Sequence, residues 1–351
     1  MLFQIPIEAA EENWVHIFLN DTLLSGFNKI DAKLQPEFWT DLAPADKIAL
    51  IDKRTRTRDA ICNVLDSYSN LASADRMLVR QALTDQGRLE DLFLGQHAAV
   101  SRDLLPVDII PSLQEMGDAV FELLTNIGIR NRSYKIFFDK IPGKLCPFCG
   151  YESIDGPNLK VEDWDHYIPK SLYPFASANL KNLSPMGMSC NRSYKKAKDT
   201  LRSNGGLRRR CFNPFTDTPP VVHVKSSPLF ARKYSLPDWQ ISIVGADPDA
   251  CETWDSVFQL KNRWSEQLDG FHRTCISFFG RSTRKSADLS RQGIIKRLEE
   301  LANGHREEMA AGSFLKFAIY ELWLDRCSVI GGEGDRLIKV LTRAVEEFGL
   351  P

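Results

Sequence analysis

Three short stretches in the middle of the chain decide the fold: CPFCG at residues 146–150, DHYIPKS at residues 165–171 and NLSPMGMSCN at residues 182–191. The residues around the second stretch predict a strand that enters a turn, and those around the third predict a second short strand and turn. SCNRSYKKAKDTLR, at residues 189–202, predicts a helix that the Gly205-Gly206 pair ends. Strand, loop, strand and helix in this order indicate a ββα unit.

Helices are expected on both sides of this unit. Apolar residues recur three and four positions apart in residues 112–128, 290–304 and 314–326, which is typical of amphipathic helices, and Gly128 falls where a helix C-cap would lie. QISIV, at residues 240–244, predicts a strand. We therefore expect an α+β protein that is mostly α. Its expected parts are a helical N-terminal region (1–135), a central module (136–215) and a mixed, mainly helical C-terminal region (216–351).

The composition limits the possible partners. The formal net charge is -1, so binding of nucleic acid would need positive charge that is concentrated locally. No apolar run is long enough to predict a membrane span, and the N-terminus lacks the basic region of a signal peptide. With nothing to indicate export, the eight cysteines are expected to be reduced thiols. We expect a cytoplasmic protein without a membrane partner.

The order and spacing of the motifs resemble the HNH endonuclease family. CPFCG, DHYIPKS, NLSPMGMSCN and the basic KKAK run at 195–198 match its successive elements, over about residues 144–215. Together with the aromatic residues of the run Phe212–Phe215, they look most like HNH nucleases of bacterial anti-phage defence systems. The resemblance implies a ββα-metal fold and hydrolysis of phosphodiester bonds in nucleic acid, with DNA favoured over RNA.

The residue types at the centre of these motifs suit that chemistry. His166 can accept a proton from water as a general base. Asp165 faces the other side of the strand, where it can hold a metal, and oxygen ligands favour Mg²⁺ or Mn²⁺. By resemblance, Asn191 supplies a second metal oxygen, and Asn182 orients the His166 imidazole. The alternative for Asn182 is an Asx-turn residue.

Cysteines predict a second, structural metal site. Cys146 and Cys149 have the CxxC spacing that chelates Zn²⁺. Relatives complete the site with a second CxxC, but here Gly187 stands in place of its first cysteine and Cys190 alone remains. Cys211 could supply the fourth ligand; the alternative is a degenerate knuckle without metal. The cysteines outside this set are expected to be buried apolar residues: Cys62, Cys251, Cys275 and Cys327.

Positive charge gathers after Asn191. Residues 191–210 contain eight Lys or Arg and one acid, Asp199. The residues expected to contact phosphate are Arg192, Lys195, Lys196 and Lys198 on the predicted helix, and Lys170 after the base. The alternative for these residues is a solvated helix face. Residues 208–210, all arginine, either contact flanking backbone or solvate a loop.

Two other functions stay open at this point. The chain could be a non-catalytic zinc-ribbon adaptor that binds nucleic acid or protein, although an adaptor has no need of Asp165, His166 and Asn191 together. Alternatively, the nuclease is the effector subunit of a defence complex with an ATPase partner, which the unexplained helical flanks allow.

Overall fold

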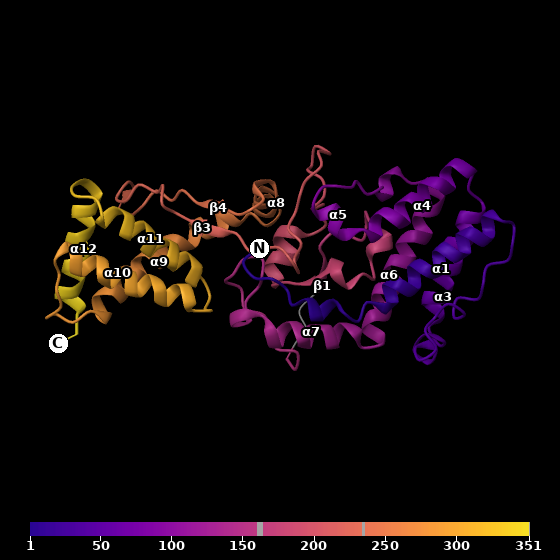
Figure 1. Ribbon diagram of the computed structural model, residues 1–351, viewed down its shortest axis with the longest axis horizontal. Coiled ribbons are helices and arrows are strands. Elements are labelled where there is room, and N and C mark those ends of the chain that lie inside the picture. Colours follow the sequence, from indigo (N-terminus) through magenta and orange to yellow (C-terminus); the bar gives the residue numbers. More distant parts are fainter. Residues whose placement is uncertain (160–163, 234–235, 351) are drawn as a thin grey trace.

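The computed structural model describes residues 1–159, 164–233 and 236–350, and these form an elongated molecule (Figure 1). The helices α1, α3, α4 and α6 lie at one end, α5, α7 and β1 lie near the middle, and α9 to α12 lie at the other end. The first residues of the chain return to the middle, where Leu2 N–H donates to the Pro147 carbonyl and Ile5 N–H to the Pro214 carbonyl, both at 2.8 Å. The molecule is mostly helical, as predicted, with two small antiparallel sheets.

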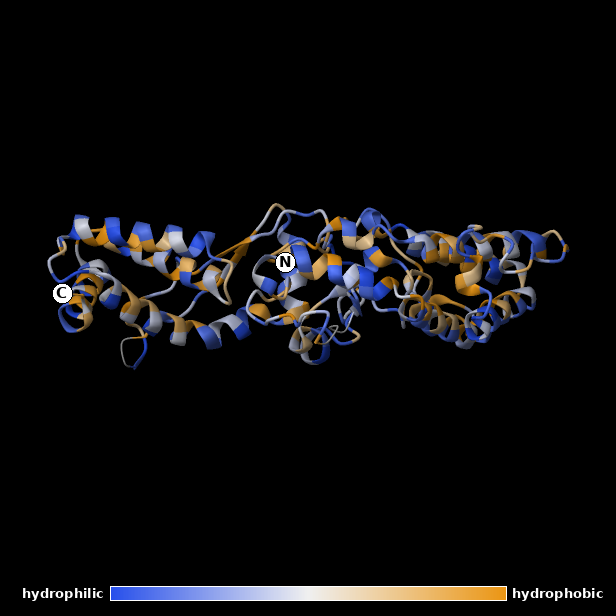
Figure 2. Ribbon diagram, turned by 90° about the horizontal axis from the view of Figure 1, so that it is seen from below, coloured by the Kyte–Doolittle hydropathy of each residue, from blue (hydrophilic) through white to orange (hydrophobic). Residues whose placement is uncertain are grey.

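Amphipathic helices build the N-terminal end. Figure 2 shows apolar and polar residues on opposite sides of the long helices at both ends of the molecule. The N-terminal helices are α1 (Trp14–Asp31), α2 (Ile48–Ile51), α3 (Thr55–Ser69), α4 (Ser73–Gly87), α5 (Leu89–Phe93), α6 (Ile110–Asn126) and α7 (Ile129–Lys140). The predicted end of α6 is confirmed, because Gly128 has a left-handed φ of 76° that favours glycine.

Two short strands form the centre. β1 (Trp164–His166) pairs antiparallel with β2 (Leu183–Pro185), and Asp165 lies opposite Ser184. The N-terminal part of the first predicted strand, residues 161–163, lies outside the described residues. Short 3-10 turns fill the connections of the N-terminal and central parts: η1 (Ile7–Ala10), η2 (Arg102–Leu104), η3 (Val107–Ile109), η4 (Pro142–Lys144), η5 (Pro174–Ala176) and η6 (Leu180–Asn182).

The helix predicted over residues 189–202 is wrong in length. A single wide turn with i→i+5 hydrogen bonding, η7 (Ser189–Lys195), follows β2, and Lys196 N–H donates to the Asn191 carbonyl at 2.8 Å. Lys196 then takes a left-handed φ of 49°, which stops the helix. Beyond it, residues 201–209 form a hairpin with Gly205 and Gly206 at its tip.

The C-terminal end is a second helical body. It contains a two-stranded sheet of β3 (Val221–His223) and β4 (Ser242–Val244), and β4 confirms the predicted strand. Its helices are α8 (Pro248–Phe258), α9 (Leu260–Ser282), α10 (Arg291–Glu307), α11 (Ser313–Cys327) and α12 (Gly332–Phe348). No helix in the described part of the chain is long and apolar enough to cross a membrane.

Candidate functional site

β1 places Asp165 and His166 on opposite sides of the central sheet, because successive strand residues point to opposite faces. His166 is buried and its ring lies 4.6 Å, centroid to centroid, from Phe121 on α6. Asp165 keeps a side chain that is 17% exposed and points toward η7. The strand therefore separates a buried imidazole from a partly accessible carboxylate, as the sequence predicts.

One hydrogen bond fixes the tautomer of His166. Its Nε2 lies 3.0 Å from the Ser177 carbonyl, which only accepts, so Nε2 carries the proton. Nδ1 then holds a lone pair, and no described residue hydrogen-bonds to it. Burial lowers the pKa of His166 to about 3. The ring is neutral at physiological pH, and its basic nitrogen is Nδ1.

Two cations lie over the ring that covers His166. The Arg130 guanidinium is 4.5 Å and the Lys170 ammonium 5.0 Å from the centre of the Phe121 ring. Lys170 also forms an ion pair with Asp118 at 2.6 Å. Lys170, predicted as a phosphate contact, thus stands beside His166 but already has a carboxylate partner. Arg130 was not found from the sequence, since it lies far from the central motifs.

Asn182 acts on the backbone and not directly on the imidazole. It is fully buried at the end of η6. Its Oδ1 accepts from Ile168 N–H at 2.8 Å, and its Nδ2 donates to the carbonyls of Ile168 and Ala176 at 3.1 and 3.3 Å. The predicted contact with the imidazole is therefore wrong. Asn182 instead joins the loop after His166 to the segment that carries Ser177.

Lys195 is not a surface residue. Its side chain is 0% exposed, and its ammonium lies 2.9 Å from Asp165 Oδ2. The prediction that Lys195 contacts phosphate is therefore wrong, because the wide turn of η7 directs this side chain inward. Lys195 instead supplies positive charge to the Asp165 carboxylate and ties η7 to β1.

Asn191 lies on the same turn as Lys195. Because η7 has i→i+5 hydrogen bonds, residues four apart lie about one turn apart, and Asn191 lies near the side of η7 from which Lys195 reaches Asp165. Asn191 is half-buried, and no described residue forms a hydrogen bond with its amide side chain. The structure thus places both predicted metal ligands on neighbouring elements, β1 and η7.

The remaining predicted cations differ in their surroundings. Lys198 Nζ donates to the Val257 carbonyl at 2.9 Å, near the C-terminal end of α8, so it caps a helix instead of facing solvent freely. Arg192 and Lys196 are exposed. Of the predicted contacts on this segment, only these two present an exposed side chain.

A buried cluster confirms that the cysteines come together as a possible metal site. Ligand atoms of Cys146, Cys149, Glu152 and Cys190 all lie within 4.8 Å of one another. Hydrogen bonds from Cys146 and then Cys190 hold the pKa of Cys149 well below its usual range. Three thiolates and one carboxylate are ligands that Zn²⁺ accepts in tetrahedral geometry. The cluster can hold a metal such as zinc.

Glu152 fills the place of the missing fourth cysteine. A Cβ added to Gly187 would lie 2.3 Å from the Glu152 carboxylate carbon, so a larger residue here would displace this side chain from its position in the cluster. The carboxylate also accepts from Ser189 N–H at 2.8 Å and Cys190 N–H at 3.4 Å. Gly187 and Glu152 are therefore complementary. The glycine was noticed in the sequence, but the acid that replaces the cysteine was not.

Cys211 does not complete the cluster. It is buried elsewhere, within hydrogen-bonding reach of Thr200 and Tyr167. The prediction failed because the short η7 does not fold the chain back toward Cys146. Among the other cysteines, Cys62 is exposed, contrary to expectation, whereas Cys251, Cys275 and Cys327 are buried as predicted.

Residues of α9 hold the cluster from the C-terminal side. The buried Arg263 donates to Cys190 Sγ at 3.3 Å and to the Tyr151 hydroxyl at 3.0 Å. Trp264 Nε1 donates to the Cys149 carbonyl at 3.1 Å. Donors to metal-binding sulfur and to the knuckle backbone fix the ligands in place. The cluster therefore stands where the central and C-terminal parts of the chain meet.

Comparison of the chain with protein-family models, with curated proteins and with solved structures finds no significant match.

The ligand set leads to a prediction about zinc content. Purified protein should carry about one Zn²⁺ per chain, and Cys190→Ser or Glu152→Ala should lower the zinc content and the melting temperature. Elemental analysis and thermal denaturation measure both. Cys211→Ser is the matched control and should keep its zinc. The pair Glu152→Ala with Gly187→Cys should restore zinc, because it exchanges one fourth ligand for another. If Glu152→Ala keeps one Zn²⁺ per chain, Glu152 is not a zinc ligand.

The ion pair leads to a prediction about stability. Lys195→Met keeps the length of the buried side chain but removes the ammonium from Asp165, so it should cost about 3 kcal/mol of the free energy of unfolding. Lys196→Met, at the exposed neighbour, should change it by less than about 0.5 kcal/mol. Urea denaturation of both variants gives the comparison. Equal stability of the two variants would show that the Asp165–Lys195 pair does not hold η7.

Proposed function

We propose that the chain is a metal-dependent endonuclease that hydrolyses phosphodiester bonds in nucleic acid, with DNA favoured as the substrate. The observation that carries the proposal is the arrangement around β1. A neutral imidazole with a fixed tautomer lies on one side of the strand, and a carboxylate facing the Asn191 helix lies on the other. Hydrolysis of a phosphodiester needs a base and a metal ligand, and these two adjacent residues of β1 supply one of each.

Each residue has a definite task in this proposal. His166 Nδ1 takes a proton from the attacking water, while the Ser177 carbonyl holds the ring in orientation through Nε2. Burial lowers the pKa of His166 to about 3, so the ring is unprotonated at neutral pH and the Nδ1 lone pair is available, while its affinity for a proton is weak. Asn182 positions the loop and acts through the backbone of Ile168. Arg130 and Lys170 place positive charge where a phosphate would approach.

A divalent metal fits the donor atoms, with one condition. Asp165 and Asn191 offer the oxygen ligands that Mg²⁺ and Mn²⁺ prefer. The carboxylate is shared with the Lys195 ammonium at 2.9 Å, so a bound cation must share or displace this contact. When bound, such a metal neutralises charge on the phosphate. Without a bound metal, Lys195 would neutralise the Asp165 carboxylate and hold η7 in place.

The Asp165–Lys195 pair also favours a second candidate function. A carboxylate that is neutralised by the protein itself does not need a metal, which is the state expected of a non-catalytic adaptor built on the cysteine cluster. Retention of His166 with a basic Nδ1 supports the enzyme over the adaptor. A role as effector of a defence complex with an ATPase partner is compatible with either.

Replacement of the proposed base, His166, distinguishes the nuclease from the non-catalytic adaptor. His166→Ala should lose about two to four orders of magnitude in the rate of cleavage, the usual contribution of a general base, and should keep its zinc. Cleavage of plasmid, single-stranded DNA and RNA is measured with Mg²⁺ or Mn²⁺. His223→Ala is the matched control, since His223 lies on β3 and pairs with Glu321. Cleavage by His166→Ala at the wild-type rate would contradict the proposed role.

A further inference from the structure

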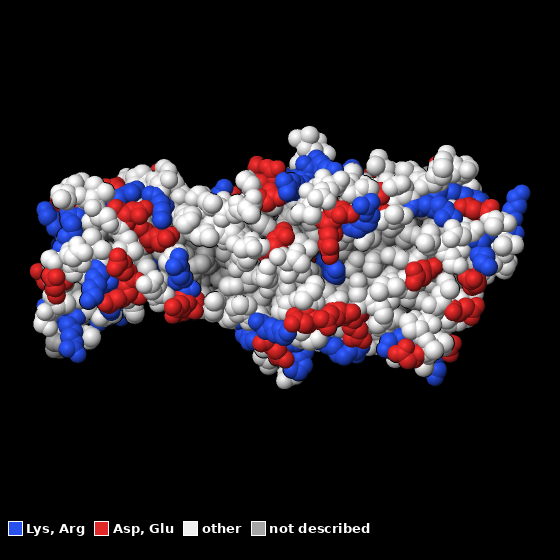
Figure 3. All heavy atoms as spheres, in the orientation of Figure 1, with Lys and Arg blue, Asp and Glu red and all other residues white. Residues whose placement is uncertain are grey.

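The positive charge that would hold nucleic acid does not lie mainly on η7. Lys195 is buried against Asp165 and Lys198 caps α8, as described above. On the face shown in Figure 3, Lys and Arg are interspersed with acidic residues and form no continuous stripe. The hairpin of residues 201–209 carries three of the remaining arginines: Arg202, Arg208 and Arg209.

Two of these arginines face each other across the hairpin. Arg202 and Arg208 form an antiparallel bridge, so their side chains lie on the same side of the two strands. Like charges directly opposite each other destabilise a strand pair. Within the described residues neither arginine forms an ion pair, although the Asp199 carboxylate interacts electrostatically with Arg202. An anion between the guanidinium groups would turn this repulsion into attraction.

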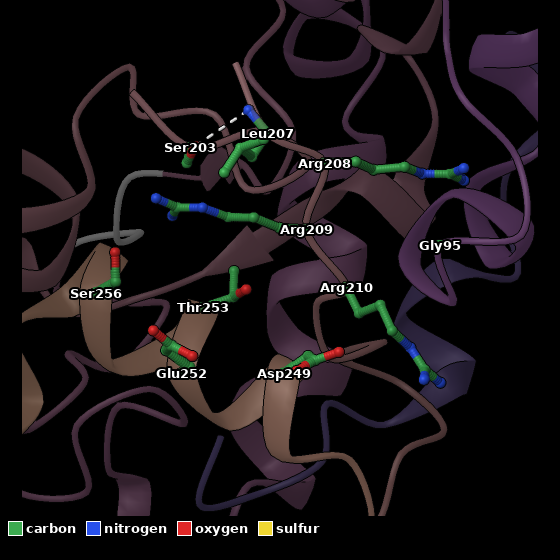
Figure 4. A pocket seen from close by; sticks show the side chains of 10 residues that line it. All are labelled: Gly95, Ser203, Leu207, Arg208, Arg209, Arg210, Asp249, Glu252, Thr253 and Ser256. Carbon is green, nitrogen blue, oxygen red and sulfur yellow. Dashed lines mark hydrogen bonds between the residues drawn. The ribbon is translucent and has the colours of Figure 1, made fainter. Parts of the chain in front are cut away.

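Arg208 and Arg209 point to opposite sides of the hairpin. Arg208 and Arg209 both line a pocket of about 450 Å³, whose other wall is the α8 face with Asp249 and Glu252. In Figure 4, Arg209 extends across this pocket, while the end of the Arg208 side chain points away from that wall. A phosphate near Asp249 and Glu252 would meet two carboxylates. The side of Arg209 is therefore unsuited to an anion, despite its arginine.

The side of Arg208 and Arg202 is different. A pocket of about 290 Å³ lies there, with His97 and Tyr173 among its lining residues. None of the lining residues in the described part of the chain is acidic. Asp199 does not line the pocket; it accepts from the Tyr173 hydroxyl at 2.8 Å. Arg202 Nη2 donates to the Ala99 carbonyl at 3.2 Å, which anchors one guanidinium in the wall.

We propose that this pocket binds one phosphate of the nucleic-acid backbone through Arg202 and Arg208. The proposal rests on the proposed nuclease function and assigns it a substrate contact outside the cleavage site. A concave site that is lined by two guanidinium groups and by no acidic residue suits a phosphodiester, which accepts paired N–H donors.

The hairpin is joined to the loop that carries the base. Thr200 Oγ1, directly before the hairpin, donates to the Tyr167 carbonyl at 3.0 Å. Tyr173, which lines the pocket, lies in the same loop after His166. A phosphate held in the pocket would thus be positioned relative to His166 by a short and well-bonded segment.

The test compares two neighbouring arginines. Arg208→Ala and Arg209→Ala are titrated with a labelled DNA duplex by fluorescence anisotropy, without added Mg²⁺ or Mn²⁺ and at several salt concentrations. Arg208→Ala should reduce the slope of log affinity against log salt by about 0.9, the value for one phosphate contact on duplex DNA. Arg209→Ala, the matched control on the acidic side, should keep the wild-type slope. Isothermal titration with inorganic phosphate tests whether a free anion binds instead.

Several results would overturn the proposal: an unchanged slope in Arg208→Ala, equal losses in both variants, or a wild type that binds no nucleic acid. If inorganic phosphate binds through Arg208 and DNA affinity does not depend on Arg208, the pocket binds a free anion and not the nucleic-acid backbone.

The pocket proposal and the nuclease proposal can fail independently. Wild-type protein that binds DNA through Arg208 but never cuts it with Mg²⁺ or Mn²⁺ supports the pocket and contradicts the nuclease. An Arg208→Ala variant that cleaves DNA normally and keeps the wild-type slope of log affinity against log salt supports the nuclease and contradicts the pocket.

Discussion

The convergence of Cys146, Cys149, Glu152 and Cys190 within 4.8 Å is the constraint on which the centre of the molecule depends. It joins the CxxC hairpin to the first residues of η7, which follows β2 after a short connection. Since η7 is a single turn, fixing its start also fixes the direction in which Lys195 and Asn191 point. Arg263 and Trp264 bring α9 to the same place, so one cluster sets the geometry of the site and the attachment of the C-terminal helices.

Electrostatics explain how a nearly neutral chain can support the proposed chemistry. Burial keeps the His166 ring neutral, which leaves the Nδ1 lone pair unprotonated at physiological pH. Lys195 balances the Asp165 carboxylate inside the protein, where solvent screens poorly. The arginines of the hairpin stay at the surface, where they can attract phosphate. The positive charge of Lys195 thus stabilises the structure, whereas the hairpin arginines have a proposed role in substrate binding.

Much of the architecture could be predicted from the sequence. The periodicity of residues 112–128 and the position of Gly128 gave the extent of α6, and the motif order gave β1, β2 and the cysteine cluster. The rest depends on tertiary structure. A lysine with positive φ has no sequence signal, so the early end of η7 at Lys196 was missed. An isolated acid such as Glu152 looks like a surface residue until Gly187 is seen to make room for it.

Cleavage with and without added metal tests the central claim most directly. Zinc-loaded wild-type protein, dialysed to remove loosely bound ions, is incubated with supercoiled plasmid before and after addition of Mg²⁺ or Mn²⁺. We predict no strand cleavage until the metal is added, and then cleavage that stops when dialysis removes the added Mg²⁺ or Mn²⁺ while the zinc stays bound, because in the proposed mechanism Asp165 and Asn191 would hold a different ion from the cysteine cluster. Cleavage at the same rate without added metal would contradict the proposed mechanism. Binding without cleavage under every metal condition would make the chain an adaptor.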